Sequence, residues 1–323
     1  MQNEIFSRKH LLTLGIVWIL IMTLSLFAFL LRPAGRVDIP LEIKKKVVDL
    51  EERMGVEREV SVPILMYHHL IPKGTQVGDG DKYNQAILTV EQFQEQMAFL
   101  ASRGYTTIDF DEYYQWVEEG TKLPEKPIII TFDDGYESNY RYAFPILKRY
   151  GFKATIFVIV SRRPDFNPKS YEPRKLTHMS WNQMRAMSLS GLISFHSHTY
   201  DLHHFVEVDE RGRKDRALVA RAYLPDKKRR ETEKEHLAKV RKDLELAKKT
   251  MEKELGKEVN VISYPFGASS KKVQGIAQEL GYTMGVSVVP GYNHKDQRLM
   301  ALRRINISPQ DNLQDLERKL MPF

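Results

Sequence analysis

Three short stretches of this 323-residue sequence concentrate side chains that could carry out chemistry. T-F-D-D-G-Y places Asp133 and Asp134 side by side, directly after an apolar run. A second stretch holds four histidines within nine residues, namely His196, His198, His203 and His204. The third is S-Y-P-F-G at 263–267. Two adjacent carboxylates raise each other's pKa and repel, unless a cation lies between them or they do different work. A strand-ending turn is the alternative for D-D-G taken alone.

A metal site would give the two aspartates different work. The chain has no cysteine, so a metal would need His, Asp or Glu ligands. Two histidines and one carboxylate form the open three-ligand set of catalytic zinc sites. His198 and His203, five residues apart, converge only if the chain turns between them, and His196 is a rival ligand on the strand face of His198. One aspartate would then be a ligand, while the other takes a proton from a water whose pKa the metal lowers.

The elements that position these stretches follow a βα rhythm. From Ser61 onward, short apolar runs alternate with helical stretches, which indicates a mostly parallel sheet. We expect strands at 62–67, 127–132, 154–160, 191–197, 259–264, 283–288 and 301–307, with a weaker one near 105–108. We expect helices at 90–103, 109–119, 137–150, 233–255 and 269–280. This pattern predicts one α/β barrel, in which chemistry gathers at the carboxyl ends of the strands.

The N-terminal segment predicts a membrane anchor. Residues 11–31 carry no charge, and a helix of that length spans about 30 Å, the thickness of the bilayer core. A cleaved signal peptide is the alternative, but its apolar stretch is usually only about 7–15 residues long. We therefore expect a cytoplasmic segment at 1–10, a single-pass transmembrane signal anchor at 11–31, a charged stalk at 32–60, and an extracellular catalytic domain at 61–323.

The composition is that of a globular protein, with 42% hydrophobic and 28% charged residues. The net charge of +7 favours anionic surfaces such as lipid headgroups or acidic wall polymers. Basic residues alternate with acidic ones and form no arginine-rich arm or zinc-finger spacing, so we expect no nucleic-acid partner. The stretch 205–235, dense in both charge signs, is interpreted as a solvated loop and helix start. We expect a monomer.

The three motifs resemble, in order, the first three motifs of the polysaccharide deacetylases. These are metal-dependent carbohydrate esterases of the NodB-homology type, carbohydrate esterase family 4. P-I-L-M-Y-H-H at 63–69 is similar to the opening strand of many members, so the resemblance covers residues 61–310. It implies a distorted (β/α)7 barrel and hydrolytic N-deacetylation of an extracellular N-acetylglucosamine polymer.

The resemblance also implies roles for individual residues. Asp133 would be the catalytic base, acting on a water that the metal activates. One divalent metal, with zinc expected, would be held by Asp134, His198 and His203. The substrate and its oxyanion would lie against Tyr136, Pro265 and Phe266, with the backbone at Phe266 stabilising the oxyanion.

The chain departs from the usual family pattern in three places. The metal-site histidines are five apart instead of four, and Ser263 stands where an arginine usually supports the base. The last strand, R-R-I-N-I-S at 303–308, has no histidine to serve as general acid. The candidates for the missing acid are His69, His204 and His294. The candidates for the missing arginine are Arg303 and Arg304.

These departures resemble one subgroup, the intercellular-adhesin type deacetylases that act on poly-β-1,6-N-acetylglucosamine in biofilms. That polymer is therefore the favoured substrate. The alternatives are a peptidoglycan or chitooligosaccharide deacetylase, and a catalytically impaired carbohydrate-binding homologue.

Overall fold

The computed structural model describes residues 60–75, 86–164, 171–173 and 175–321, together with Glu42 and Lys46. The chain divides into two compact units, Met1–Glu57 with Phe323, and Arg58–Pro322, and the fold below is that of the second unit. The predicted cytoplasmic segment and anchor lie outside the described residues, as does nearly all of the predicted stalk. In the described part of the chain, no helix combines the length and apolar character needed to cross a membrane.

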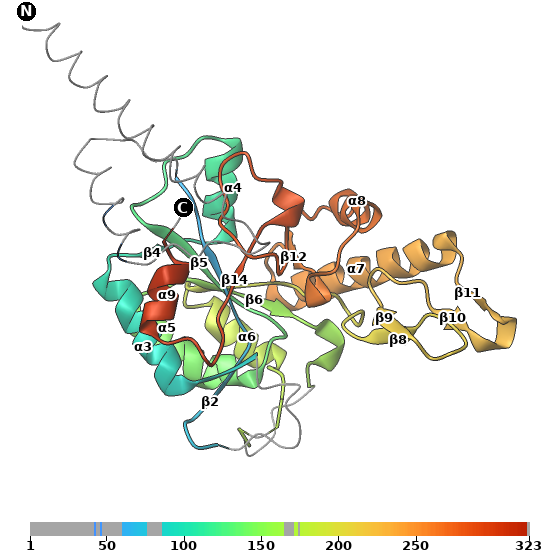
Figure 1. Ribbon diagram of the computed structural model, residues 1–323, viewed down its shortest axis with the longest axis horizontal. Coiled ribbons are helices and arrows are strands. Elements are labelled where there is room, and N and C mark those ends of the chain that lie inside the picture. Colours follow the sequence, from blue (N-terminus) through green and yellow to red (C-terminus); the bar gives the residue numbers. More distant parts are fainter. Residues whose placement is uncertain are drawn as a thin grey trace, which may run out of the picture. The chain divides into compact units, whose positions relative to one another are not determined.

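Seven parallel strands curl into a barrel-like sheet (Figure 1). They are β1 (Ile64–Tyr67), β5 (Pro127–Phe132), β6 (Ala154–Val158), β7 (Ile193–Ser197), β12 (Val261–Ser263), β13 (Met284–Val286) and β14 (Ile305–Asn306). Their spatial order is β14-β1-β5-β6-β7-β12-β13. From β1 to β13, each of these strands pairs with the next one in the chain, and β14 pairs with β1. The two edges approach where Val286 of β13 forms a parallel bridge with Leu302, just before β14. This arrangement is consistent with the expected (β/α)7 barrel, and the weak strand near 105–108 is present as β4 (Thr106–Thr107), beside β5.

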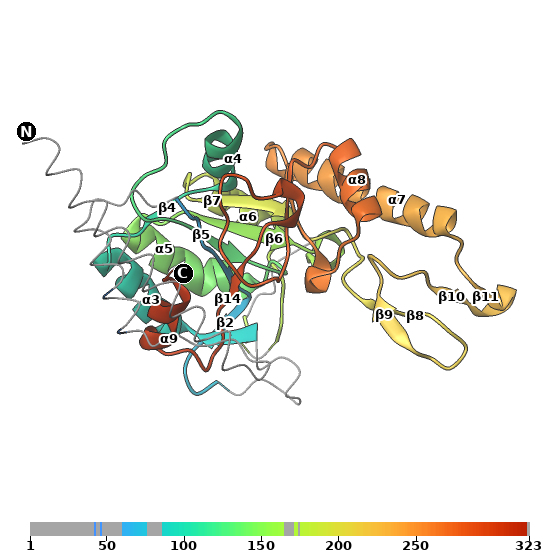
Figure 2. The same cartoon turned by 45° about the horizontal axis from the view of Figure 1, so that its top comes forward.

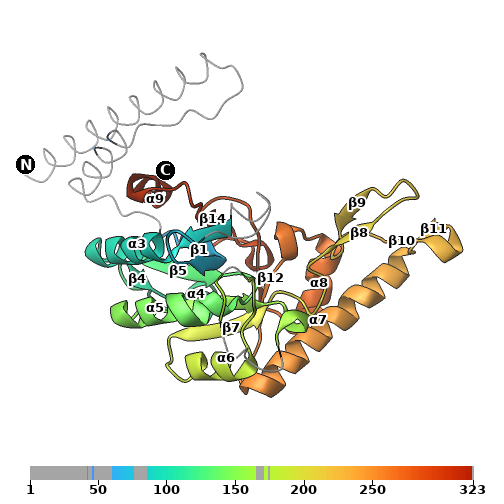
Figure 3. The same ribbon diagram turned by 90° about the horizontal axis from the view of Figure 1, so that it is seen from below.

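Helices cover the outer face of the sheet (Figure 3). They are α3 (Val90–Ser102), α5 (Phe144–Tyr150), α6 (Trp181–Ser188), α7 (Glu233–Leu255), α8 (Lys271–Glu279) and α9 (Leu313–Lys319). The helix predicted at 137–150 begins instead with a π-helical turn, Asn139–Ala143, before α5. Capping boxes begin α3, α6, α7 and α9, because a Ser, Thr or Asn side chain at each N-cap accepts from the backbone three residues on.

The inner face of the sheet has its own apolar cluster. Ile64, Ile129, Phe157 and Val261 pack there, with residues of α4 (Phe110–Glu118) in the same cluster. Side chains of a strand alternate between its faces, so every second residue onward from these positions also faces inward. Near the carboxyl ends of the strands, the inward-facing positions carry polar residues in place of apolar ones. These polar side chains form a site in the barrel interior.

A hairpin arm, defined here as residues 205–232, separates β7 from α7. It contains two antiparallel pairs, β8 (Phe205–Glu207) with β9 (Lys214–Arg216), and β10 (Tyr223–Leu224) with β11 (Arg229–Arg230). Figure 2 shows both pairs projecting from the barrel beside α7. The solvated loop interpreted from the sequence is thus built of short hairpins. A further short pair, β2 (His69–Ile71) with β3 (Ile87–Thr89), follows β1.

Candidate active site

The D-D-G turn sends the two aspartates in different directions. The backbone N–H of Asp133 still donates to Tyr67 O at 2.9 Å, so this residue continues β5. Asp134 and Gly135 then both adopt left-handed backbone conformations, with φ of 74° and 76°. Gly135 suits this turn because a Cβ there would lie only 3.3 Å from a methyl group of Val158 and would have the same disfavoured φ. The two adjacent carboxylates therefore lie in different surroundings, as the sequence suggested.

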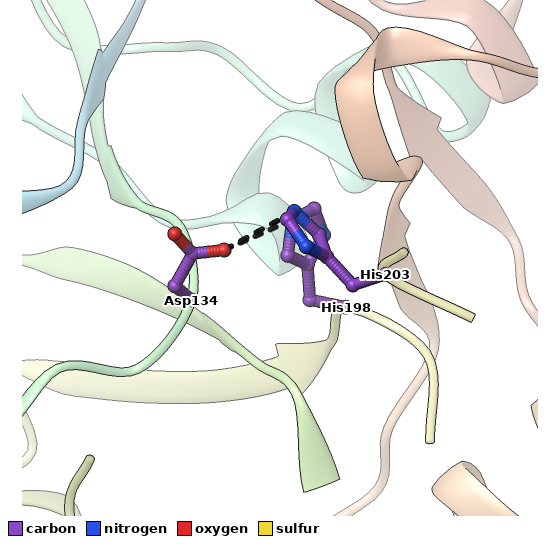
Figure 4. Close-up of side chains that lie close together, drawn as sticks. All are labelled: Asp134, His198 and His203. Carbon is purple, nitrogen blue, oxygen red and sulfur yellow. Dashed lines mark ion pairs between the residues drawn. The ribbon is translucent and has the colours of Figure 1, made fainter. Parts of the chain in front are cut away.

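Asp134 faces His198 and His203 (Figure 4). Its Oδ1 lies 3.5 Å from Nε2 of His198 and 3.4 Å from Nε2 of His203. Four ligands at about 2.0–2.1 Å from a tetrahedral zinc are separated by about 3.3–3.4 Å, so both distances from Asp134 Oδ1 are close to those of such a ligand set. All three ligand atoms lie within 4.8 Å of one another. Asp134 Oδ1 is buried and has no hydrogen-bond partner in the described part of the chain, which suits a cation as its missing partner.

The ring of His198 is oriented for this role. Its Nδ1 lies 2.7 Å from the backbone O of Ser263, a contact that requires Nδ1–H as the donor. The lone pair of Nε2 is then directed at the shared point beside Asp134. His196, the rival ligand, lies deeper on the same strand face, 6.5 Å from the ring of Phe157, and is not part of the cluster.

A tight turn brings His203 back to His198. Thr199 has a left-handed backbone with φ of 72°, which is unusual for a β-branched residue. Asp243 of α7 accepts hydrogen bonds at 2.9 Å from the backbone N–H groups of both Tyr200 and Asp201. The two histidine rings end 4.8 Å apart. The expected turn in T-Y-D-L is present, and a carboxylate from another helix holds it.

Asp133 is paired with a buried arginine from the far end of the chain. Arg304 donates from Nη1 to Asp133 Oδ1 at 2.8 Å and from Nη2 to Oδ2 at 2.7 Å, a bidentate ion pair. The guanidinium is wholly buried and also donates to the backbone O of Ser287 and to the hydroxyls of Ser263 and Thr131. Of the two predicted candidates, Arg304 therefore lies beside Asp133, whereas Arg303 is exposed.

The charges around the site keep both carboxyls ionised. Burial alone raises the pKa of Asp133, but the Arg304 guanidinium and then His198 more than offset it, so this pKa lies well below its usual range. Burial likewise raises the pKa of Asp134, whereas His203 and His198 lower it, with a net decrease. Burial, followed by the neighbouring His198, lowers the pKa of His203 to about 4. Neutral imidazoles beside an ionised carboxylate are the forms that ligate a metal.

The structure does not place the predicted acids in the site. Both ring nitrogens of the buried His69 are engaged, Nδ1 with Ser138 Oγ at 2.9 Å and Nε2 with the backbone O of Pro173 at 3.3 Å. His204 is exposed and its Nδ1 bonds the backbone O of Asp201. His294 follows Asn293, whose backbone pairs with Val62 at the amino end of β1, opposite the site. We therefore retain none of the three as the acid.

Sequence reasoning missed two histidines that lie near the aspartates. His68 follows Ile64 and Met66 in the inward alternation, and its charge lowers the pKa of both Asp133 and Asp134. The period-two pattern of β1 could have selected His68 over His69. His178 is the second; burial lowers its pKa to about 4, against the opposing effect of the Asp134 charge.

Of the three residues expected to contact substrate, Phe266 lies against this cluster and Tyr136 lies against His178. The ring of Phe266 is 4.4 Å from that of His203, and Pro265 beside it is buried. Tyr136 is buried, with its ring 5.0 Å from that of His178.

The fold is a parallel barrel whose strand ends carry a cluster of two histidines and a carboxylate, beside an aspartate that is paired with an arginine. This combination defines a class of protein, the hydrolases with a metal-type site. The sequence matches the family described as polysaccharide deacetylase over residues 120–285. The Bacillus subtilis protein YxkH, named for the same family, is 30% identical over 83% of this chain and 79% of its own length. The chain therefore belongs to the polysaccharide deacetylase family. It is an enzyme that hydrolyses carbon–nitrogen bonds other than peptide bonds.

Two further relatives share most of the described domain. The Escherichia coli (strain K12) protein named poly-β-1,6-N-acetyl-D-glucosamine N-deacetylase is 26% identical over 71% of this chain, but only 34% of its own length is covered. The deacetylase domain of BpsB from Bordetella bronchiseptica superposes with a TM-score of 0.66 at 27% identity, covering 78% of this chain and 98% of that one. Both are similar to this chain in the barrel that carries the site.

Proposed function

We propose that this chain removes N-acetyl groups from an extracellular N-acetylglucosamine polymer, releasing acetate and leaving a free amine. Poly-β-1,6-N-acetylglucosamine is the favoured polymer. The observation that carries the proposal is the Asp133–Arg304 ion pair beside the Asp134–His198–His203 cluster. The name of the Escherichia coli relative and the departures from the common family motifs support the choice of linkage.

The proposed metal is one divalent cation, held by Asp134, His198 and His203. Zinc suits two imidazoles and one carboxylate, and a zinc ion would polarise the acetamide carbonyl and lower the pKa of a water to about 7. The fit rests on the two distances from Asp134 Oδ1 to the histidine nitrogens, and on the absence of a hydrogen-bond partner for that oxygen among the described residues.

The remaining steps are assigned to the chain's own residues. Asp133 takes the proton of the attacking water, while Arg304 fixes the plane of its carboxylate. The backbone N–H of Phe266 is proposed to stabilise the oxyanion, and Tyr136 and Pro265 to bound the substrate. His68, whose charge lowers the pKa of both aspartates, is proposed to protonate the leaving amine. Water and acetamide thereby become acetate and amine without a further reactant.

The proposal includes where the enzyme works. The uncharged stretch 11–31 is long enough to anchor the chain in a membrane, and we propose a monomer with its catalytic domain outside the cell. The product amine would be cationic at neutral pH and would alter how the polymer adheres to anionic surfaces.

Acetate release from defined oligomers tests the function. The full chain in detergent is offered β-1,6 and β-1,4 N-acetylglucosamine oligomers, with zinc or with a chelator, alongside Asp133→Asn. We expect metal-dependent release that favours the β-1,6 linkage and falls at least about 100-fold in the variant. A preference for β-1,4 would indicate a peptidoglycan or chitooligosaccharide deacetylase. Release no greater than that of Asp133→Asn would indicate an impaired carbohydrate-binding homologue.

A further inference from the structure

Two exposed phenylalanines extend outward from the metal-type site. Phe266 is 36% exposed and Phe205, at the base of the hairpin arm, is 52% exposed. Their ring centroids are 4.8 Å apart, and the ring of Phe266 is 4.4 Å from that of His203. The three rings thus form a continuous row from a candidate metal ligand to the arm.

The backbone holds both phenylalanines in these outward positions. In β8, Phe205 alternates with Val206, and Val206 is the one that packs against the core. Phe266 has a left-handed backbone with φ of 56°, a conformation that costs free energy in any residue other than glycine. The next residue is fixed as well, because a Cβ on Gly267 would lie 2.3 Å from a methyl group of Val288. Strain that leaves an aromatic ring exposed is typical of a functional surface.

The surroundings of the row fit a carbohydrate better than a lipid or an apolar protein surface. Glu207 lies on the same face of β8 as Phe205, and across the ladder Lys214 opposes Glu207 and Arg216 opposes Phe205. A narrow aromatic strip with charged neighbours can receive the C–H face of a sugar ring while the polar groups bond its hydroxyls. The row also joins the site where such a polymer would react.

We propose that Phe205 and Phe266 form a stacking subsite for a sugar ring of the polymer next to the ring being deacetylated. The first strand of the hairpin arm thereby lengthens the substrate-binding surface beyond the reacting residue. This inference rests on the proposed function for the nature of its ligand, an N-acetylhexosamine oligomer. It predicts that oligomers long enough to reach Phe205 bind more tightly than a disaccharide.

The test compares Phe205→Ala with Phe205→Trp and with Leu189→Ala, an exposed apolar residue at the end of α6 that is 88% exposed. For a hexamer, we expect Phe205→Ala to raise KM by about 2–10-fold with kcat unchanged, as the loss of one aromatic stacking contact implies. Phe205→Trp should restore KM, Leu189→Ala should match the unmodified chain, and a disaccharide should show no difference among the variants. Equal KM values for Phe205→Ala and Leu189→Ala on the hexamer would overturn the subsite.

Binding without turnover separates this inference from the proposed function. Calorimetric titration of the N-acetylglucosamine hexamer into Asp133→Asn, with and without Phe205→Ala, measures the subsite directly. If the hexamer binds and Phe205→Ala weakens it about 2–10-fold, the subsite stands even where no acetate is released. If acetate is released but Phe205→Ala leaves hexamer binding unchanged, the deacetylase stands and the subsite is wrong.

Discussion

Replacing Arg304 by Met should reveal how strongly the barrel interior depends on one ion pair. The guanidinium is wholly buried and makes two charge-assisted bonds to Asp133, at 2.8 and 2.7 Å. Methionine fills a similar volume but leaves Asp133 as a buried, uncompensated carboxylate. Breaking a buried pair in this way costs about 3–5 kcal/mol in the free energy of unfolding. For a domain of this size, that loss lowers Tm by roughly 6–20 °C.

The loss should depend on pH in a defined direction. The pKa of Asp133 is lower in the folded chain than in the unfolded chain. The stabilisation from the ion pair is therefore fully present above the unfolded-state pKa of about 4, and it is lost as the pH falls through the folded-state pKa. Without Arg304, burial raises that pKa instead, and the penalty grows as the pH rises above about 4. The variant and the unmodified chain should therefore differ most at neutral pH and converge in acid.

Chemical denaturation at several pH values, with acetate release measured in parallel, checks this prediction. Arg303→Met is the matched control, because its exposed side chain should change the free energy of unfolding by less than about 0.5 kcal/mol. The double variant Asp133→Asn/Arg304→Met should recover part of the loss, since it leaves no unpaired charge. A loss below about 1 kcal/mol for Arg304→Met, with normal acetate release, would refute the reasoning.

Three further predictions follow from the site. Zinc at 100 times its Kd should stabilise the unmodified chain by about 2.7 kcal/mol and so raise its Tm. Asp134→Ala and His203→Ala should each abolish this rise in Tm. A rise that persists in either variant would contradict the ligand set. Burial raises the pKa of Asp243 to about 6, so protonation below that pH removes an acceptor from the Tyr200–Asp201 turn, and acetate release should fall between pH 7 and 5. Asp243→Asn should release little acetate at either pH. Identical pH profiles of acetate release for Asp243→Asn and the unmodified chain would exclude this role. His69→Gln should lose about 1–3 kcal/mol of stability, because the contacts of His69 to Ser138 and Pro173 are removed, and its kcat should stay within a few-fold of that of the unmodified chain. An unchanged Tm with a 100-fold loss of kcat would restore His69 as the acid.

The strands and most helices could be predicted because their patterns are local. The apolar runs that precede Asp133 and His198 are long enough to indicate buried strands, and α7 shows its 3.6-residue period over 23 residues. Helices α6 and α9 were not predicted, because each is at most eight residues long and repeats its apolar spacing only once or twice. The hairpins of the arm are equally short and mostly polar, so they give no periodic signal.

The metal-type cluster was predictable from composition and spacing, whereas its support was not. The bond from Arg304 to Asp133 joins residues 171 positions apart, and only the register of β14 against β1 selects Arg304 over Arg303. Likewise, His68 and His69 are chemically identical in the sequence, and which one faces the aspartates depends on the side of β1 that turns inward. The ring contact between Phe205 and Phe266 joins the arm to a loop after β12, and no local pattern encodes that contact.

The central claim is that Asp134, His198 and His203 hold one divalent ion on which deacetylation depends. Its most direct test is a zinc titration of chelator-stripped protein while acetate release from a β-1,6 N-acetylglucosamine oligomer is measured. We predict that release rises in proportion to zinc up to one equivalent per chain and then levels off, and that His203→Ala shows no such rise. Full acetate release from the metal-free chain would contradict the account.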